Sequence, residues 1–339
     1  MGAQIAGPAP LRNTALLGLG VHRPERIVTN HEICQQIDSS DEWIQSRSGI
    51  KERRFAEDTG ETVLDMAISA GRKALEAAGI TGDRLGAVIV ATSTYPYQTP
   101  QSAALVADAL GTGGAAALDI SAGCAGFCYA LGVASDLVRA GTEDYALVIG
   151  VERMSDTTEP TDRSVRFIFG DGAGAVVVGP SDEVGIGPTV WGSDGSQADA
   201  IRQEPDWVNF ANNPDQKRPW IIMEGTAVFR WAAFEMGKIA RQIADKAGVE
   251  LAALDAFVPH QANLRINDVI VRQLDLPETV AVADDIIETG NTSAASIPLA
   301  MEKMLRTGQV QPGGLGLLLA FGAGLSYAGQ VVKMPPLAQ

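Results

Sequence analysis

The sequence is short of cysteine and histidine, with three of each in 339 residues. An odd number of cysteines gives no disulfide framework, and thiols that stay reduced are typical of cytoplasmic proteins. Cys124 and Cys128 stand four positions apart, but no further cysteine or histidine cluster completes a zinc site with them. We therefore expect a cytoplasmic protein with no metal site.

Basic residues and long apolar runs are also lacking. Lys and Arg number 26 against 41 Asp and Glu, a formal net charge of −15. This balance argues against nucleic-acid binding, and an acidic partner would need a local cationic patch. The apolar runs are too short to span a bilayer. Residues 1–12 have no signal-peptide pattern, and Ala6 stands where a myristoylation signal has Ser or Thr. We expect no membrane association and a flexible N-terminal tail over residues 1–12.

What the sequence does contain is an internal repeat. Residues 74–92 and 242–260 share one layout: a helix end, a glycine stop, a short loop and an apolar β-rich run. Gly79 and Gly248 set the offset at 248 − 79 = 169, and residues 146–150 lie over 315–319 at the same offset. The repeat predicts a duplicated α/β protein with an N-terminal lobe at 13–180 and a C-terminal lobe at 181–339.

Cys124 stands in SAGCAGFCYAL, where the flanking side chains are small. Apolar residues follow at helical spacing from 127 to 138, which places the thiol at the N-terminus of a buried helix. Free backbone N–H groups and the positive end of the helix dipole favour a thiolate there. Small neighbours would also let a substrate carbonyl approach. A buried core cysteine is the alternative, and Cys128 fits that description.

Two residues of the second lobe could act with this thiol. His260, in AFVPHQANLRI, follows an apolar strand pattern, whereas the other two histidines lie in polar N-terminal sequence. Asn291, in TGNTSAAS, belongs to a small-residue segment whose Ser293 lies over Cys124 at the 169-residue offset. A surface histidine and a turn asparagine beside Gly290 are the alternatives. We expect the two small-residue segments to meet and form a site.

Three further segments suggest a ligand or close packing. DEWIQSRSGIKERR (41–54) places Trp43 beside four cations, a combination that can stack on a base and bind phosphates, although a solvated loop has the same composition. The glycines of FGDGAGAVVVG (169–179) fit neither the dinucleotide fingerprint nor the phosphate loop, which favours close strand packing. FGAGLSY (321–327) follows an apolar strand and is expected to line the same site.

Taken together, these segments resemble β-ketoacyl-acyl carrier protein synthase III of actinobacterial type, a condensing enzyme of the thiolase superfamily. Six stretches occur in the family's order from about residue 13 onward: DEWIQSRSGI, SAGCAGFCYAL, DRSVRFIFGDGAGA, VPHQANLRI, GNTSAAS and FGAGLSYAG. The resemblance implies an α/β, thiolase-like fold of duplicated αβαβα layers with two pseudo-symmetric lobes, in agreement with the repeat.

The resemblance also implies roles for particular residues. Cys124, His260 and Asn291 match the catalytic triad of the family. The backbone N–H groups of Cys124 and Ala323 match its oxyanion hole. Positions that hold the coenzyme A adenine, phosphates and pantetheine match Trp43, Arg47, Ser48, Arg163 and Asn263, although Ser48 stands where a threonine is common.

The implied reaction needs neither a metal nor a redox cofactor. Cys124 takes an acyl group from acyl-CoA, and malonyl-acyl carrier protein then loses CO₂ and condenses with it, which initiates type II fatty acid synthesis. The implied partners are acyl carrier protein, acyl-CoA and a second copy of the chain in a homodimer. Arg230 and Arg265 match carrier-docking cations, and Arg230, Lys238 and Arg241 share one face of a helix predicted at 229–247.

Thr99 matches an acyl-channel position at which acetyl-preferring members carry Phe, so we expect longer or branched primers. Three other functions have to be weighed. A priming ketosynthase or acyltransferase of a polyketide pathway keeps the fold and the acyl-cysteine. A non-catalytic carrier-binding subunit is disfavoured by the intact Cys124. A cysteine hydrolase would need water access that an apolar-walled thiol does not offer.

Overall fold

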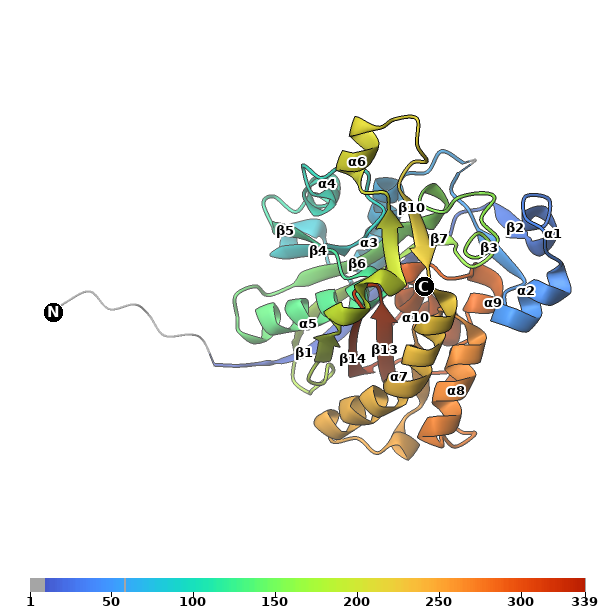
Figure 1. Ribbon diagram of the computed structural model, residues 1–339. Helices are drawn as coiled ribbons and strands as arrows, with labels where there is room; N and C mark the ends of the chain where they lie inside the picture. Colours follow the sequence, from blue (N-terminus) through green and yellow to red (C-terminus); the bar gives the residue numbers. More distant parts are fainter. Residues whose placement is uncertain (1–9, 58, 339) are drawn as a thin grey trace.

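The computed structural model describes residues 10–57 and 59–338 of the chain (Figure 1). Most of the expected N-terminal tail, residues 1–9 with Ala6, lies outside the described residues. Among the described residues, no helix combines the length and the apolar character that crossing a bilayer requires.

Two five-stranded sheets form the frame of the molecule. The N-terminal sheet consists of β1 (Asn13–His22), β4 (Ala87–Ala91), β5 (Ala116–Ile120), β6 (Ala146–Arg153) and β7 (Asp171–Ser181). The C-terminal sheet consists of β8 (Val190–Ser193), β11 (Ala256–Pro259), β12 (Ala281–Val282), β13 (Leu315–Gly322) and β14 (Ser326–Lys333). Their spatial orders, β1-β7-β6-β4-β5 and β8-β14-β13-β11-β12, match strand for strand. The duplication read from the sequence is therefore confirmed.

The larger helices form three layers around the sheets. These helices are α3 (Val63–Ala78), α4 (Ser102–Ala109), α5 (Gly126–Arg139), α7 (Gly225–Ala247), α8 (Leu264–Leu274) and α10 (Ser296–Arg306). α5 and α10 lie between the sheets, in one apolar cluster with the inner faces of both. α3 and α4 cover the outer face of the N-terminal sheet, and α7 and α8 that of the C-terminal sheet (Figure 1). The predicted thiolase-like αβαβα layering is confirmed.

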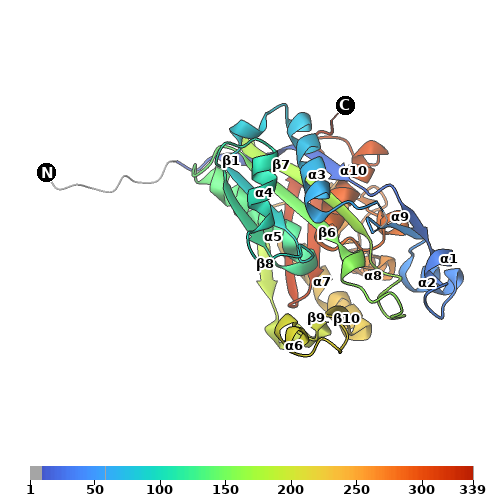
Figure 2. The same cartoon turned by 90° about the horizontal axis from the view of Figure 1, so that it is seen from above.

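Smaller elements sit at the edges of this layered body (Figure 2). One group consists of β2 (Ile27–Thr29), α1 (Asn30–Ile33), α2 (Asp41–Ser48), β3 (Glu52–Arg54) and α9 (Ile286–Thr289). Another consists of β9 (Ile201–Glu204), α6 (Trp207–Asn212) and β10 (Trp220–Met223). The short 3-10 turns are η1 (Gly82–Arg84), η2 (Gly123–Ala125), η3 (Met154–Asp156), η4 (Gly195–Ala200), η5 (Leu251–Ala253) and η6 (Ser293–Ala295).

Equivalent helices end in the same way in the two lobes. α3 ends at Gly79 with φ 65°, and α7 ends at Gly248 with φ 69°. Glycine adopts this left-handed conformation without the steric penalty that a Cβ brings. These two stops are the glycines that set the 169-residue offset in the sequence, and β4 and β11 keep the same offset, since they begin at Ala87 and Ala256.

Beyond β4 and β11 the offset is 170 rather than 169. Ala87 pairs with Ala146 in the first sheet, whereas Ala256 pairs with Gly316 in the second. The side chains that face the central layer agree: those of residues 146 and 148 in β6, and those of 318 and 320 in β13. The predicted alignment of 146–150 with 315–319 is therefore off by one. Sequence similarity did not reveal this one-residue slip. The sheet reveals it, because side chains alternate between the two faces and a shift of one residue would turn each of them to the other face.

The same slip changes which residues correspond at the two central turns. η2 begins at Gly123 and η6 begins at Ser293, a difference of 293 − 123 = 170. The position equivalent to Cys124 is therefore Ala294, and the expected superposition of Cys124 on Ser293 is wrong by one residue. The expectation that the two segments meet is confirmed, because η2 and η6 pack against each other between the sheets.

Candidate active site

Cys124 lies in the middle of η2, directly before α5, so the expected place at the head of a buried helix is confirmed. Neither η2 nor α5 begins with a side-chain cap, so no nearby side chain competes for the N-terminal N–H groups. Gly123 has φ 52°, a conformation that suits glycine.

The turn that follows β13 lies against the cysteine. A Cβ built on Gly322 would stand 2.7 Å from the backbone nitrogen of Cys124 and 2.9 Å from its Cβ. A Cβ built on Gly123 would stand 3.2 Å from the backbone nitrogen of Ala323. Glycine at both positions therefore lets the backbones of the two lobes approach closely. This approach brings the Cys124 and Ala323 backbones together, as the predicted oxyanion hole requires, and that role itself stays a prediction.

His260 follows β11 directly and is 1% exposed. Its Nδ1 lies 2.7 Å from Oγ of Ser296, at the start of α10. That oxygen also accepts from the N–H of Gln261 at 3.4 Å, which leaves the Ser296 hydroxyl free to donate to Nδ1. The arrangement favours the tautomer with its proton on Nε2. Burial lowers the pKa of His260 to about 3, so the imidazole is neutral and Nε2–H is a hydrogen-bond donor at neutral pH.

Asn291 is held by its backbone and by its side-chain oxygen. Its N–H donates to the Ile168 carbonyl at 2.8 Å, and its carbonyl accepts from Gly170 at 3.0 Å. Its Oδ1 accepts from the N–H of Ser293 at 2.8 Å. With the oxygen fixed in this way, the Nδ2 amide group is the part of the side chain that can donate to a ligand.

One cavity of about 710 Å³ is lined by Cys124, His260 and Asn291 together. Ala323 lines the same cavity, as do Trp43, Arg47, Asn263 and Arg265. The three residues predicted to act together come from separate parts of both lobes, and the fold brings them to one space. The arrangement combines a nucleophile with neutral donors, as acyl transfer through a thioester requires.

The protonation state of Cys124 differs from the expected thiolate. Burial raises the pKa of Cys124 to about 12; the nearby Ser293 hydroxyl lowers the pKa, and the Glu152 carboxylate raises it. Three units above an ordinary thiol correspond to about 4 kcal/mol, whereas a helix N-terminus contributes at most ~2 kcal/mol. Burial therefore outweighs the helix dipole, and Cys124 is a thiol at neutral pH.

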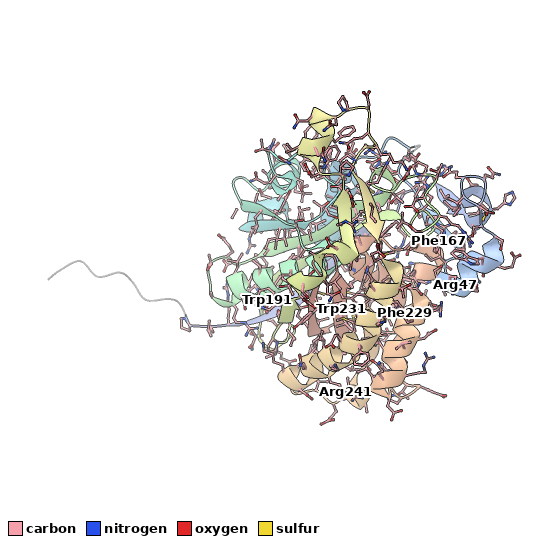
Figure 3. All side chains as sticks on the ribbon, in the orientation of Figure 1. Arg47, Phe167, Trp191, Phe229, Trp231 and Arg241 are labelled. Atoms are coloured by element: carbon pink, nitrogen blue, oxygen red, sulfur yellow. The ribbon has the colours of Figure 1, made fainter. Side chains whose placement is uncertain are left out.

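The mouth of the cavity carries the predicted cations around Trp43. The Arg163 guanidinium lies 4.6 Å from the centre of the Trp43 ring and that of Arg47 lies 5.9 Å away. Phe167 meets the same ring edge-on at 5.3 Å, and Figure 3 labels Arg47 and Phe167 in this region. Asn263 donates from Nδ2 to the Arg47 carbonyl at 3.0 Å, so the mouth joins segments of both lobes.

Ser48 does not reach this cavity. It is fully buried, its hydroxyl donates to the Ile44 carbonyl at 2.7 Å, and the same oxygen accepts from Ile50 at 3.2 Å. The hydroxyl therefore closes the end of α2, which differs from the predicted contact with coenzyme A. Ser48, at a position where the family often has threonine, therefore stabilises the helix that carries Trp43 and Arg47.

Thr99 and the predicted docking cations lie on the surface. Thr99 and Arg230 are exposed, and the roles predicted for them in the acyl channel and in carrier docking stay predictions. α7 begins at Gly225, four residues before the predicted Phe229. On its exposed face Lys238 pairs with Glu235 at 3.0 Å, and Arg265 of α8 stacks over the Phe229 ring at 5.6 Å.

Three residues of the site were missed at the level of sequence. Ser293 and Ser296 stand inside the GNTSAAS segment but received no role, and Glu152 lies at the end of the apolar run ALVIGVER. A carboxylate directly after an apolar strand was the available signal for Glu152. Among the described residues, no group of three or more His, Cys, Asp or Glu side chains is placed to hold a metal ion.

Comparison with known proteins places these features in one family. The family model described as 3-oxoacyl-[acyl-carrier-protein] synthase III matches residues 118–195, and the model of its C-terminal part matches residues 244–334. A protein of Mycobacteroides abscessus called β-ketoacyl-[acyl-carrier-protein] synthase III is 58% identical over 337 residues, 99% of this chain and 98% of that protein. A protein of Mycobacterium marinum called mycobacterial β-ketoacyl-[acyl-carrier-protein] synthase III is 56% identical over 98% of this chain and 99% of its own.

Two solved structures are similar over nearly their whole length. The priming β-ketosynthase of the R1128 polyketide pathway is 45% identical, with a TM-score of 0.96 over 99% of this chain and 100% of its own. The 3-oxoacyl-(acyl carrier protein) synthase III of Pseudomonas aeruginosa is 39% identical, with a TM-score of 0.88 over 97% of this chain and 100% of its own.

Proposed function

The chain belongs to the 3-oxoacyl-[acyl-carrier-protein] synthase III family, and from this premise we propose that it condenses an acyl-CoA primer with malonyl-acyl carrier protein. The product is β-ketoacyl-acyl carrier protein, formed in the first condensation of type II fatty acid synthesis. The observation that supports this function best is the single cavity lined by Cys124, His260 and Asn291.

In the first half-reaction the Cys124 sulfur attacks the thioester carbonyl of acyl-CoA. The carbonyl oxygen becomes an oxyanion beside the backbone nitrogens of Cys124 and Ala323, and collapse of this intermediate releases coenzyme A. An acyl-enzyme remains. Trp43, Arg47 and Arg163 at the mouth, with the Asn263 amide, provide stacking, charge and hydrogen bonds for the coenzyme A portion.

In the second half-reaction malonyl-acyl carrier protein enters and loses CO₂. The electrons of the breaking C–C bond form an enolate on the thioester, and its oxygen receives hydrogen bonds from Nε2–H of His260 and the Asn291 amide. The enolate carbon then attacks the acyl-Cys124 carbonyl and frees the thiolate. A neutral His260 serves this step because its donor is retained without a proton being taken from solvent.

We propose that no metal or redox cofactor takes part, because each oxyanion that develops in this scheme has backbone amide, side-chain amide or imidazole donors within the chain. The reaction is assigned to the cytoplasm, where acyl-CoA and acyl carrier protein are available. Arg230 and Arg265 are proposed to guide the carrier protein. Replacing Arg230, which does not line the cavity, with Glu should raise KM for malonyl-acyl carrier protein and leave acylation by acyl-CoA unchanged; an unchanged KM would remove Arg230 from docking.

We also propose that the enzyme is a homodimer. β5 is the outermost strand of the N-terminal sheet, and the exposed apolar side chains Tyr97 (65%) and Leu105 (40%) lie in the neighbouring segment. An unpaired strand edge beside apolar surface favours pairing with a second copy. Light scattering on the purified chain should give twice the monomer mass, and a monomer at micromolar concentration would contradict the assignment.

The same segment bears on primer choice. Thr99 is exposed in the single chain, so its proposed place in an acyl channel depends on the partner subunit. We expect longer or branched acyl-CoA primers to be accepted over acetyl-CoA. Thr99→Phe should then depress acylation by long primers more than by acetyl-CoA. Unaltered selectivity in this variant would show that Thr99 does not line the channel.

Two assays test the function itself. Intact mass spectrometry after incubation with acyl-CoA should show one acyl adduct, which is absent in Cys124→Ala. Adding malonyl-acyl carrier protein should then release CO₂ and discharge the adduct. An adduct without CO₂ release would indicate simple acyl transfer, and no adduct at all would indicate a binding subunit.

A priming ketosynthase of a polyketide pathway is the second candidate. The TM-score of 0.96 with the R1128 priming ketosynthase favours it. The chemistry is the same, so the carrier protein decides: a strong preference for a polyketide carrier over the fatty acid carrier would establish this alternative.

A further inference from the structure

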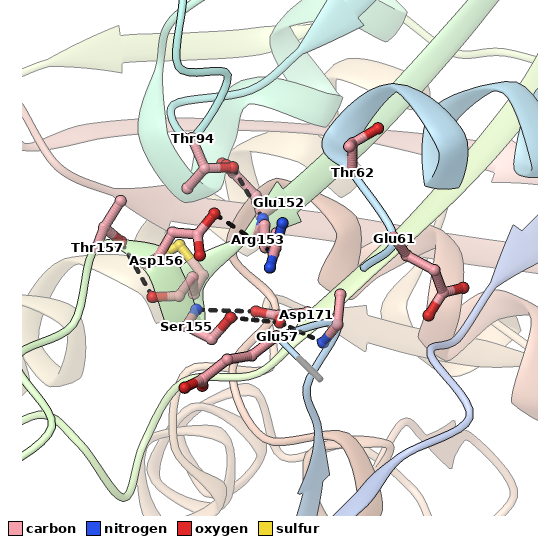
Figure 4. Close-up of polar contacts among 12 residues, drawn as sticks. Glu57, Glu61, Thr62, Thr94, Glu152, Arg153, Ser155, Asp156, Thr157 and Asp171 are labelled. Atoms are coloured by element: carbon pink, nitrogen blue, oxygen red, sulfur yellow. Dashed lines mark hydrogen bonds and ion pairs between the residues drawn. The ribbon is translucent and has the colours of Figure 1, made fainter. Parts of the chain in front are cut away.

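Glu152 is a fully buried carboxylate one step away from the reacting thiol. It lies in β6 with 0% exposure and accepts hydrogen bonds from Thr94 Oγ1 at 2.7 Å, Ser93 Oγ at 2.9 Å and Ser93 N–H at 3.0 Å. Figure 4 shows Thr94 and Glu152 side by side. Buried carboxylates are costly unless they are paired or serve a function. Donors surround this one, and none of its hydrogen bonds comes from a basic side chain.

Ser293 connects this carboxylate to the thiol. Its hydroxyl donates to Oε1 of Glu152 at 3.0 Å, and the same hydroxyl is near enough to the Cys124 sulfur to lower the pKa of the thiol. Its backbone is held at φ 50°, and its N–H is taken by Oδ1 of Asn291. A serine hydroxyl has one proton and two lone pairs. When the proton points to Glu152, a lone pair is free to accept from the thiol.

His260 is poorly suited to take the proton of Cys124. Its Nδ1 faces Ser296, its ring is buried against Phe321 at 5.3 Å, and its Nε2 carries the proton that the condensation step needs. The acylation step therefore requires another acceptor within the site, since the Cys124 thiol, whose pKa is raised, must lose its proton before it attacks.

We propose that Glu152 accepts the proton of Cys124 through the hydroxyl of Ser293. The S–H bond of Cys124 breaks and its proton passes to Oγ of Ser293, while the proton already on Oγ passes to Oε1 of Glu152. A thiolate and a carboxylic acid replace a thiol and a carboxylate, so the net charge of the site is unchanged. When the coenzyme A thiolate departs, it takes the proton of Ser293 Oγ, and the proton on Glu152 passes back to that Oγ, so that Glu152 is again a carboxylate. The part that this proton relay plays in turnover rests on the proposed function.

The surroundings of Glu152 contain few competing charges. On the side of η2 the titratable group is Cys124 itself. Arg153 follows Glu152 in β6, and its Nε lies 3.3 Å from the Asp156 carboxylate. Asp171 on the neighbouring β7 accepts from Ser155 and Ala56 and not from the Ser293 network. Tyr95 follows the strand end that supplies Ser93 and Thr94. Asp171 therefore offers a matched control: it is a second buried carboxylate on an adjacent strand without a hydrogen bond to the relay.

Alkylation of Cys124 by iodoacetamide, followed by mass spectrometry from pH 6 to 9.5, tests the relay without any substrate. The thiolate formed by internal transfer to Glu152 does not depend on pH while Glu152 is ionised, so the wild-type rate should be nearly flat wherever this population exceeds the thiolate formed by loss of the proton to hydroxide. Glu152→Gln and Ser293→Ala should alkylate about 10²-fold more slowly at pH 7. Their rates should rise close to tenfold per pH unit, because only hydroxide then removes the proton. Asp171→Asn should keep the flat profile.

Acylation by acyl-CoA should fall in parallel in the same two variants, while condensation from enzyme acylated beforehand stays within about threefold of wild type. Two independent variants guard against a failure of either to fold. A wild-type profile that rises tenfold per unit, or variants with the wild-type profile, would overturn the relay. If wild type alkylates as expected but forms no acyl adduct, the proposed function is wrong and the relay stands.

Discussion

The two central turns, η2 and η6, occupy equivalent places in the two lobes and have different chemistry. Each precedes a buried helix, and each begins with a left-handed residue, Gly123 at φ 52° and Ser293 at φ 50°. At the next position the first lobe has Cys124 and the second has Ala294. One turn therefore presents a nucleophile, and the other presents the Ser293 hydroxyl, which lowers the pKa of that nucleophile.

The strands around these turns also carry different chemistry at equivalent positions of the two lobes. Glu152 of β6 corresponds to Gly322 of β13 at the 170-residue offset, and Ala91 of β4 corresponds to His260 at 169. The first lobe thus supplies the ionisable pair of thiol and carboxylate, and the second supplies a neutral imidazole and a glycine that admits the cysteine. Duplication accounts for the frame, whereas the chemistry depends on positions at which the copies differ.

The largest expected effect is an opposite response of the two lobes to acid. Burial holds the pKa of His260 at about 3 against an ordinary 6.5, so between these values only the unfolded chain binds the proton. Stability is lost as pH falls through this window, by up to about 5 kcal/mol. Burial raises the pKa of Asp171 from 3.8 to about 6, so there the folded chain binds the proton and stability is gained as pH falls from 6 to 3.8, by up to about 3 kcal/mol.

Urea unfolding between pH 7.5 and 4 separates the two contributions. His260→Gln should lose stability less steeply than wild type as pH falls below 6.5. Asp171→Asn should lose it more steeply below pH 6. Equal slopes in all three proteins would show that these buried groups do not set the acid response and would break the contrast between the lobes.

A second prediction concerns the glycine that stands where the first lobe has Glu152. In Gly322→Ala the new Cβ would lie 2.7 Å from the Cys124 nitrogen, so the two backbones must move apart. Acylation should slow by about 10²–10³-fold, the usual cost of losing an oxyanion donor. Stopped-flow acylation with acyl-CoA measures the change, and a loss of less than threefold would mean that this close approach does not shape the site.

A smaller effect is expected at Ser296. In Ser296→Ala the hydroxyl that fixes Nδ1 of His260 is absent, and either ring nitrogen can then carry the proton. Decarboxylation of malonyl-acyl carrier protein should fall about 2- to 10-fold, the range of one net hydrogen bond. Acylation should be unaffected, and an equal fall in both half-reactions would indicate general disruption in place of a tautomer effect.

Small residues and repeated glycine helix stops are the sequence features that predicted the fold and the nucleophile. Gly79 and Gly248 revealed the duplication, and the small neighbours of Cys124 marked the nucleophile. Sequence similarity did not fix register, and so the one-residue slip between β11 and η6 went unseen. The sequence also did not show that desolvation affects the pKa of Cys124 more than the helix dipole does, which leaves the thiol protonated at neutral pH.

Polar residues that act through long-range contacts were the hardest to find. Glu152 meets Ser293 across 141 residues of sequence, and His260 meets Ser296 only because α10 begins beside the end of β11. Ser48 shows the converse, because a hydroxyl expected at the ligand bonds its own helix end. In each case the tertiary neighbour, which composition and spacing do not specify, decides the role.

The division of labour between the lobes is tested most directly by measuring both half-reactions on His260→Ala. We expect a full acyl adduct on Cys124 by intact mass after incubation with acyl-CoA, with CO₂ release from malonyl-acyl carrier protein reduced about 10²–10³-fold. An enzyme that forms no acyl adduct, or one that releases CO₂ at the wild-type rate, would contradict it.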